Sequence, residues 1–462
     1  MPYRSPQTLH TLAAEDTAAS RVRYRVVGML VLMAVLLYLD RFCIGAATPA
    51  MIDELGVTKE RFGRAVGAFF LAYALMQVPA GWLADRFGGR TTLAAYVALW
   101  SLATFAMGFA HGLTAILSMR IVLGVFQAGA YPAAAAIIRH WMPLAGRARA
   151  NSCVSTGGRL GGLLAFAVTP LLMQTVAVSF GWTSGLWRPV FMIYGGLGLA
   201  WAAVFWWRHR DRPRLHPNCN RAEVAQIELG SPPCAEALST LDEPARRLSL
   251  APLLLDYNVW VLSSINFLLN IGWVFLVTWM PTYLVEVYGD ELDAVFASAD
   301  RSGDLRSTVA GLLTAVTALA GMAGNLCGGW WGDRAVARYG LRWGRRVTGL
   351  VSSVLAALIY LAAQWTDNMW LFVAEMIAIS FLADLVLGSL WAIYQDIGRG
   401  NTAVVLGFAN MCGNLGAAGY GWLIGLLADE RQWTLVFAIS SVGFCISAVC
   451  WLVADATRTV KA

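Results

Sequence analysis

Asp40 and Arg41 stand side by side in the middle of an apolar run that extends over residues 26–52. A run of that length can cross a bilayer, which needs about 20 apolar residues. A charge near the bilayer midplane costs about 2.5 to 3.5 kcal/mol, so such residues usually face a bundle interior or a water-filled pathway. We interpret the two side chains as markers of a central transport cavity. The alternative is a neutralised structural pair that locks this helix to its neighbours.

Three further ionisable side chains lie inside apolar runs: Arg120, Arg159 and Asp384. Arginine binds a carboxylate at two points through its planar fork of donors, and it stays charged when desolvated. Together with Arg41, three arginines would face only two buried acids, so the cavity would be net positive when empty. This balance predicts a small organic anion as the ligand. The alternative for Asp384 is a structural counter-ion that pairs with Arg159 or Arg120 across the cavity.

Uncharged polar side chains recur at helical spacing in several other apolar runs. They would meet the hydroxyl groups of a sugar acid, while a tryptophan lies against the sugar face; phosphorylated or aromatic acids are alternative ligands. Ordinary helix packing with interhelical hydrogen bonds explains the asparagines equally well. The further candidates for substrate binding are Tyr73, Gln127, Asn270, Trp391, Asn410 and Asn414, with Trp273 as a second aromatic candidate.

The composition supports a membrane protein independently of these residues. Hydrophobic residues make up 58% of the 462-residue chain and charged residues 13%, whereas a soluble domain carries about 25% charged residues. The apolar runs predict an all-α membrane protein with twelve transmembrane helices in two six-helix bundles. The predicted spans are 26–52, 62–84, 92–110, 113–138, 150–175, 188–207, 257–285, 308–332, 347–364, 369–395, 401–427 and 434–454.

An even number of spans places both termini on the same side of the membrane. Of the 34 Lys and Arg residues, 24 lie in the segments on that side, 7 in the opposite loops and 3 inside the spans. The positive-inside rule therefore predicts cytoplasmic termini in a multi-pass protein of the inner (plasma) membrane. The net charge of +6 reflects this topology, so we predict no nucleic-acid partner. We expect a cytoplasmic tail (1–25), an N-terminal bundle (26–207), a cytoplasmic linker (208–256), a C-terminal bundle (257–454) and a second tail (455–462).

A short sequence recurs at the ends of two equivalent spans, where residues 81–90 read GWLADRFGGR and residues 329–334 read GWWGDR. The recurrence indicates that the two halves are related by duplication. Each aspartate falls where a helix leaves the membrane, and there it can pair with an arginine or meet the positive N-terminus of a neighbouring helix. That contact would hold the bundles together in one state and break in the other. The predicted gating residues are Gly81, Asp85, Arg86, Gly88, Arg90, Asp333 and Arg334.

Residues 81–90 resemble the signature loop of the major facilitator superfamily. Other segments are similar to its anion:cation symporter family, which includes bacterial hexuronate and aldonate transporters, sialin and the vesicular glutamate transporters. The resemblance covers essentially the whole chain, and it implies alternating access around a midplane site, driven by an ion gradient. It also implies that Arg41 and Arg120 face the organic anion. The segments that carry it are 38–41 (YLDR), Tyr73 with 77–81 (QVPAG), 120–132, 279–284 (WMPTYL) and 410–416.

The same family places acidic residues that carry coupled protons in helices 1 and 4, and Asp40 matches the first of them. Gln127 departs from the pattern, since the family usually has Glu there and an amide cannot release a proton. We therefore predict proton-coupled symport in which Asp40 is the principal carrier and Asp384 partly replaces the missing Glu. The alternatives are a uniporter, an exchanger or a sodium-coupled carrier of the same anions, and a sensor that binds them without transport.

The sequence does not favour an enzyme. The five histidines, at positions 10, 111, 140, 209 and 216, lie at span ends or in loops, so they form no catalytic cluster at membrane depth. The eight cysteines show no paired metal spacing. We therefore expect no cofactor, no metal and no catalytic residue. The expected partners are a small organic anion, H+ as the coupling ion and the lipid bilayer, with the protein as a monomer.

Overall fold

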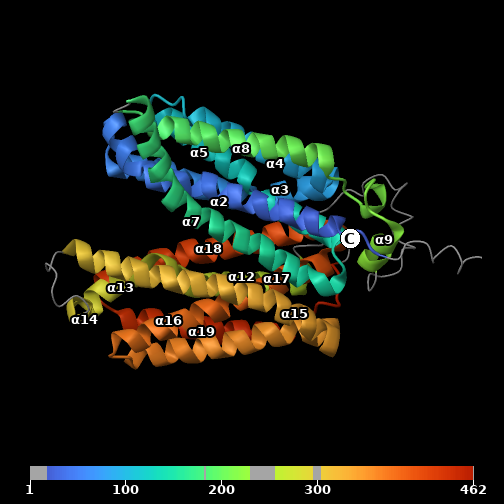
Figure 1. Ribbon diagram of the computed structural model, residues 1–462. Helices are drawn as coiled ribbons and strands as arrows, with labels where there is room; N and C mark the ends of the chain where they lie inside the picture. Colours follow the sequence, from blue (N-terminus) through green and yellow to red (C-terminus); the bar gives the residue numbers. More distant parts are fainter. Residues whose placement is uncertain (1–17, 182–183, 229–254, 295–302, 461–462) are drawn as a thin grey trace, which may run out of the picture.

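The computed structural model describes residues 18–181, 184–228, 255–294 and 303–460. Helices dominate these ranges, and Figure 1 shows that they gather into two bundles, one from each half of the sequence. Most of the predicted first tail, much of the predicted linker and residues 295–302 lie outside the described residues. The predicted all-α architecture is confirmed.

The first bundle contains six membrane-spanning segments. Its fourth segment consists of two helices, α5 and α6, which meet end to end at Ala128 and Gly129. The break lies directly after Gln127, so this side chain stands at the end of a helix inside the bundle. The helices are α2 (Val22–Leu55), α3 (Lys59–Phe87), α4 (Gly89–Met107), α5 (Leu113–Gln127), α6 (Ala130–Trp141), α7 (Arg147–Phe180) and α8 (Trp187–Arg208).

The second bundle also contains six segments, and its helices are distorted, bent or interrupted at three places. Pro281 has no N–H to donate, and a π-helix, η3, precedes it. Gly340, with φ of 75°, bends α15 between two successive spans. Val386 separates the two halves of the tenth span. The elements are α12 (Tyr257–Val274), η3 (Phe275–Trp279), α13 (Met280–Val287), α15 (Gly303–Ala362), α16 (Met369–Leu385), α17 (Leu387–Gly398), α18 (Thr402–Asp429) and α19 (Trp433–Val453), with the short α14 (Gly289–Ala294) before α15.

The predicted spans agree with these helices to within a few residues at most ends. Nine helical stretches among the described residues are long and apolar enough to cross a membrane, and two of them, Val309–Trp365 and Met369–Ala428, each contain two consecutive spans. The 19-residue α4 lies at the remaining predicted span, 92–110. The twelve predicted spans are therefore confirmed.

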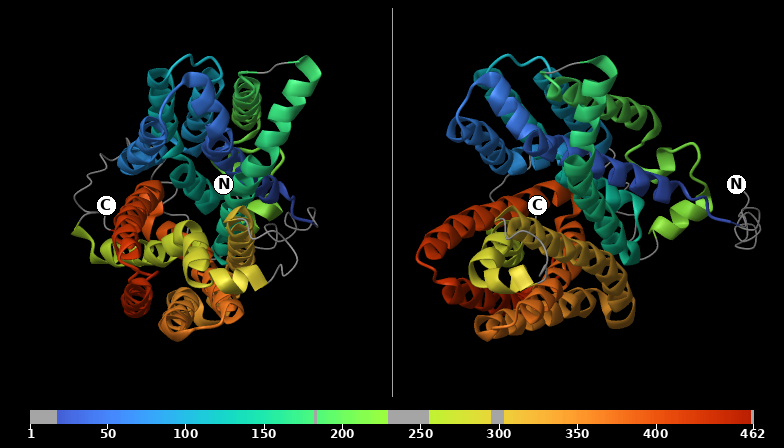
Figure 2. Two further views of the ribbon diagram at one scale, coloured as in Figure 1. Left: turned by 90° about the vertical axis from the view of Figure 1, so that its left-hand side faces the viewer. Right: turned by 60° about the vertical axis from the view of Figure 1, so that its left-hand side comes forward.

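Both ends of the described chain lie at the same end of the bundles, at the right of Figure 1, and we call this end the terminal face. Figure 2 shows the two bundles, one above the other, from two further sides. Helix α9 (Arg221–Glu228) lies there and is joined to the start of α2. The fully buried Glu223 carboxylate accepts hydrogen bonds from the backbone N–H groups of Val22 and Arg23, both at 3.0 Å. These N–H groups have no partner inside their own helix. At the other end of the chain, the Val460 N–H donates to the Ile397 carbonyl at 3.0 Å.

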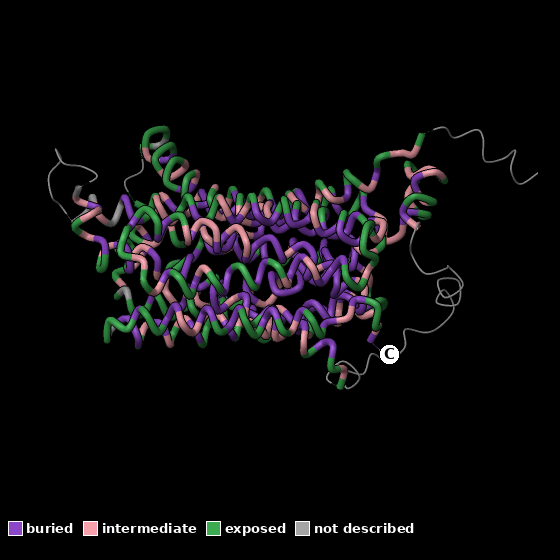
Figure 3. The backbone as a smooth tube through the Cα atoms, turned by 90° about the horizontal axis from the view of Figure 1, so that it is seen from below, coloured by how far each residue is buried: buried purple, intermediate pink, exposed green. Residues whose placement is uncertain are grey.

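The bundles contact each other along two seams, where α3 packs against α18 and α7 packs against α15 and α17. Figure 3 shows buried segments concentrated where helices face one another and exposed segments along their outer sides. Many of the exposed side chains are large and apolar, such as Leu71 and Leu75 on α3. An apolar exterior is what a lipid environment requires, because lipid tails offer polar groups no partner.

Candidate functional site

Arg41 projects from the middle of α2 into the first bundle, where aromatic rings surround its guanidinium group. The group lies 4.9 Å from the ring centre of Tyr38, 5.1 Å from that of Phe69 and 4.5 Å from that of Tyr73. Such contacts stabilise a desolvated cation through the negative faces of the rings. Tyr73, a predicted binding residue, therefore lies directly against Arg41.

Gln127 holds Arg41 in place. Its Oε1 accepts a hydrogen bond from Arg41 Nε at 3.1 Å, and its Nε2 donates to the Leu37 carbonyl at 3.1 Å. The amide thus satisfies one donor and one acceptor, and it adds no charge. Gln127 is fully buried.

Arg120 approaches the same place from α5. Its guanidinium group lies 4.5 Å from the ring centre of Phe69, and its Nη1 donates to the Arg41 carbonyl at 3.4 Å. Arg120 is 1% exposed and Arg41 is 8% exposed. The buried Nη2 of Arg41 and Nε of Arg120 have no hydrogen-bond partner among the described residues, and no carboxylate pairs with either arginine there. Two buried cations with free donors and no acidic partner among the described residues have the charge and hydrogen-bonding groups that an anion would complement.

Asp40 does not share this site, although it precedes Arg41 in the sequence. Its Oδ2 accepts a hydrogen bond from Trp100 Nε1 of α4 at 3.1 Å, and its buried Oδ1 has no partner among the described residues. Neighbours on a helix point about 100 degrees apart, so the two side chains contact different helices. Asp40 is 1% exposed and lies inside the first bundle. Among the described residues no ion pair joins Asp40 to Arg41, and each side chain has its own neutral partner, Trp100 for Asp40 and Gln127 for Arg41.

Arg159 and Asp384 form an ion pair that joins the two bundles, with both terminal guanidinium nitrogens engaged. Arg159 comes from α7 and Asp384 from the end of α16. The Asp384 side chain is 3% exposed and that of Arg159 is 21% exposed. Asp384 therefore compensates Arg159 and leaves the other two arginines without an acid.

A second contact between the bundles lies beside the arginine site. The Tyr131 ring packs edge-on against Trp391 of α17 with ring centres 4.9 Å apart, and it also contacts Tyr38 at 6.4 Å. Trp391 is a predicted binding residue, and these two tyrosine contacts connect it to the surroundings of Arg41. The aromatic candidate from the second bundle is therefore close to the predicted site.

The predicted asparagines lie elsewhere in the second bundle. Asn270 donates to the Asn266 carbonyl and Asn414 to the Asn410 carbonyl, each at 2.8 Å and each along its own helix. Asn266 donates to the Ala409 carbonyl across α12 and α18 at 2.8 Å. The asparagine candidates are half-buried, and the hydrogen bonds described for them lie within the second bundle.

The two repeated aspartates make equivalent contacts at the terminal face. Asp85 of α3 accepts hydrogen bonds from the N–H groups of Ala403 and Val404, at 3.0 and 2.8 Å. Asp333 of α15 accepts them from the N–H groups of Ala148 and Arg149, each at 3.1 Å. Each carboxylate therefore caps the N-terminus of a helix in the opposite bundle.

The glycines of the repeated sequence have separate tasks. A Cβ on Gly81 would lie 2.5 Å from the Ala403 carbonyl oxygen, so only glycine lets α3 approach α18 this closely. Gly88 has φ of 83°, which suits the sharp turn from α3 into α4.

The arginines of the repeated sequence contact groups of their own bundles. The Arg90 guanidinium donates twice to the Trp206 carbonyl, and the Arg90 N–H donates to Asp211. Two further arginines each lie over the ring of a tryptophan four residues earlier in the chain. These pairs are Arg86 over Trp82 at 5.0 Å and Arg334 over Trp330 at 3.6 Å.

Sequence reasoning missed a buried charge network at the terminal face. Asp396 at the end of α17 accepts from Arg147 of the opposite bundle at 2.7 Å and from Arg345 at 3.2 Å. Asn151 and Gln395 exchange two hydrogen bonds across the same seam, at 3.1 and 3.0 Å. A signal was present, because Asp396 follows a predicted span end and Arg147 stands in a basic loop on the same predicted side.

Comparisons with known proteins show what this chain is similar to in sequence and in fold. Residues 30–418 and 301–462 match the sequence model of the Major Facilitator Superfamily. A protein described as a probable sulfoacetate transporter from Cupriavidus necator is 28% identical, over 95% of each chain. A D-galactonate transporter from Escherichia coli is 29% identical, over 88% of this chain and 90% of that one. The structure of the proton:xylose symporter XylE superposes with a TM-score of 0.70 at 14% identity, over 95% of this chain and 97% of that one, and shows a shared fold.

Proposed function

Because the chain belongs to the Major Facilitator Superfamily and is therefore a membrane transporter and not an enzyme, we propose that it carries a small organic anion across the membrane by alternating access. The observation that carries this proposal is the pair of buried arginines, Arg41 and Arg120, with free N–H donors and no carboxylate partner among the described residues. A carboxylate or sulfonate would supply the missing charge and acceptors at two points.

The proposed substrate class is a small carboxylate or sulfonate with hydroxyl groups, such as a hexuronate or aldonate. The names of two relatives, transporters of sulfoacetate and of D-galactonate, support such an anion. Aromatic side chains around Arg41 and Trp391 would pack against the carbon skeleton. We propose Tyr73, Gln127 and Trp391 as the neutral part of the site, with the asparagines of the second bundle reached only after the bundles move.

Lysine substitutions test the arginine pair. We expect Arg41→Lys and Arg120→Lys each to weaken the binding of D-galactonate by at least about tenfold, because an ammonium group does not reproduce two-point contact. Titration of the purified protein with D-galactonate, monitored through the melting temperature, measures the affinity. Arg188→Lys is the matched control, since Arg188 pairs with Glu54 at 2.8 Å away from the site. Near-normal affinity in both site variants would contradict the proposal.

The contacts at the terminal face support the assignment of this structure to one state of the alternating-access cycle. Asp85, Asp333 and Asp396 each join one bundle to the other there. The excess of Lys and Arg in the segments of that face favours a cytoplasmic position. We therefore propose that this structure is the state closed toward the cytoplasm, and that the aspartate contacts break when the site opens inward.

The coupling ion that we propose is H+, with Asp40 as its principal carrier. Asp40 is buried, has one oxygen without a partner among the described residues and is not neutralised by an arginine. Asp384 is tied to Arg159, so it would exchange a proton only when that ion pair breaks. Proton uptake on addition of substrate to proteoliposomes tests this coupling. Its absence in the unmodified protein would favour a uniporter, an exchanger or a sodium-coupled carrier.

A further inference from the structure

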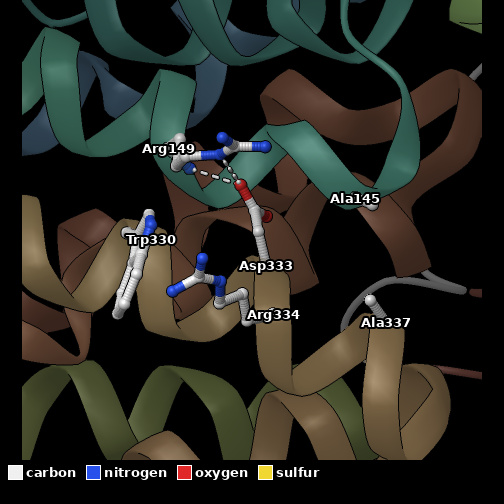
Figure 4. Close-up of a pocket in the computed structure, with 6 residues that line it drawn as sticks. All are labelled: Ala145, Arg149, Trp330, Asp333, Arg334 and Ala337. Atoms are coloured by element: carbon white, nitrogen blue, oxygen red, sulfur yellow. Dashed lines mark hydrogen bonds and ion pairs between the residues drawn. The ribbon is translucent and has the colours of Figure 1, made fainter.

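A groove of about 220 Å³ lies on the seam between the two bundles, at the terminal face, between the start of α7 and the middle of α15. Figure 4 shows Arg149 on one side of this groove and Arg334 on the other, with Trp330 beside them. The predicted gating residues include Asp333 and Arg334 but not Arg149 or Trp330, so gating does not explain why these side chains lie together. The residues that line the groove are Ala145, Arg149, Trp330, Asp333, Arg334 and Ala337.

The charge of the groove is positive because the one acid among its lining residues is already compensated. Asp333 is 3% exposed, and its carboxylate pairs with Arg149 Nε at 3.0 Å and with the buried Arg345 at 3.7 Å. Arg334 is exposed and has neither a hydrogen bond nor an ion pair among the described residues. Its guanidinium group rests on the Trp330 ring, with all its N–H donors available.

An apolar surface leads away from these charges along both helices. On α15, Leu326 is 45% exposed and Trp330 is 51% exposed, four residues apart and on the same face as Arg334. On α7, Cys153 and Leu160 are exposed on the side that begins with Arg149. An arginine pair above an apolar strip that crosses from one bundle to the other has the charge and polarity pattern that complements a phospholipid.

The internal repeat provides a comparison within the same molecule. On the other seam, Trp82 and Arg86 take the places of Trp330 and Arg334, and Asp85 takes the place of Asp333. The helix N-terminus that Asp85 caps carries Val404 where the first groove has Arg149. The seam between α7 and α15 therefore has an arginine at the capped helix N-terminus, where the other seam has an apolar residue. A second contact to a phosphate is available at that place.

We propose that this groove binds the headgroup of an anionic phospholipid, with Arg149 and Arg334 on the phosphate and an acyl chain along Trp330 and Leu326. Arginine suits phosphate because its fork of donors matches two of the oxygens. The groove is formed by α7 of one bundle and α15 of the other, so its lipid stabilises the state in which the terminal face is closed. The bound lipid would therefore regulate how often the transporter adopts this closed state.

Melting temperatures of the purified full-length protein in detergent test the site. We expect added short-chain phosphatidylglycerol to raise the melting temperature more than phosphatidylcholine does. Arg334→Gln should need about five times more phosphatidylglycerol for the same shift, since a basic residue near an anionic surface contributes about that factor. Arg334→Lys should weaken the effect less than Arg334→Gln does, since it keeps the charge and loses only the two-point contact. Arg86→Gln, at the equivalent place on the other seam, is the control and should respond like the unmodified protein.

Replacement of Arg334 leaves the hydrogen bonds of Asp333 in place, so its variants should fold. Equal responses of Arg334→Gln and the unmodified protein to phosphatidylglycerol would overturn the proposal. Equal shifts with phosphatidylcholine would overturn it as well, because charge would then be irrelevant. A shift of the same size with soluble glycerol phosphate would assign the groove to a free phosphate and not to a lipid.

Discussion

The neutral amide of Gln127 determines how much positive charge the proposed anion site keeps. It accepts from Arg41 Nε without compensating the arginine, and it donates to a backbone carbonyl of α2. A carboxylate in the same place would pair with Arg41 and compete with the substrate. The anion:cation symporters, which this chain resembles, usually have Glu at this position. In this chain the residue that contacts Arg41 Nε is an amide, and it cannot carry a proton.

Gln127→Glu should therefore make anion affinity depend on pH. The introduced carboxyl neutralises Arg41 when it is ionised and leaves the arginine uncompensated when it is protonated, so anion affinity falls as the pH rises through the pKa of that carboxyl. Titration of D-galactonate over a pH series measures this. Gln127→Met, which removes both hydrogen bonds and adds no charge, is the control and should weaken binding equally at every pH. The same pH profile in the Gln127→Glu variant and the unmodified protein would show that Arg41 does not hold the anion.

At the scale of helices, the two aspartate caps are equivalent in position and unequal in their partners. Asp85 meets two backbone N–H groups of α18. Asp333 meets two such groups of α7 and also pairs with Arg149 and Arg345. A helix N-terminus stabilises a carboxylate by about 0.3–2 kcal/mol, whereas removal of one partner from a buried ion pair costs about 3–5 kcal/mol. Of these ion pairs, only the one with Arg149 joins the two bundles, since Arg345 belongs to α15 like Asp333. We therefore expect Asp333 to contribute more than Asp85 to the contact between the bundles.

Neutralisation of each aspartate should open the terminal face, and Asp333→Asn should open it more than Asp85→Asn. Labelling of cysteines introduced at the terminal face reports the change. Asp211→Asn is the matched control, since Asp211 accepts from the Arg90 N–H at 2.7 Å within one bundle. If the control variant opens the face as far as the other two, these carboxylates serve folding and not the contact between bundles.

For the whole molecule, the polar contacts between the bundles gather at the terminal face and continue to the Arg159–Asp384 pair. Movement of one bundle against the other must break or rearrange this pair. A lone buried charge is far more costly than a paired one, so each partner needs the other in the closed state.

Arg159→Asp and Asp384→Arg should each reduce uptake of D-galactonate into proteoliposomes strongly, because each leaves two like charges in contact. The double variant restores the attraction with the charges exchanged, so it should recover a substantial part of the uptake. Melting temperatures of all three variants separate loss of transport from loss of folding. A double variant that folds normally but transports no better than either single variant would mean that Arg159 contacts the substrate directly.

The sequence by itself determined the spans, their number, the repeat and the depth of the ionised residues. These properties depend on the length and order of apolar runs along the chain, which neighbouring residues decide locally. The same reasoning placed Asp85 and Asp333 at helix ends, and the structure has each of them against a helix N-terminus. Arg41 and Arg120 were likewise recognisable as buried cations before any contact was known.

Only the tertiary structure decided which charges are compensated. Asp384 pairs with Arg159 and not with Arg120, and Asp40 turns to Trp100 and away from Arg41. The sequence left these alternatives open because the partner of a helical side chain depends on which helix lies beside it and at what rotation. The burial of Asp396 between two arginines was hidden for the same reason. Pairing across a bundle is a property of helix packing, and no periodicity along one chain segment contains it.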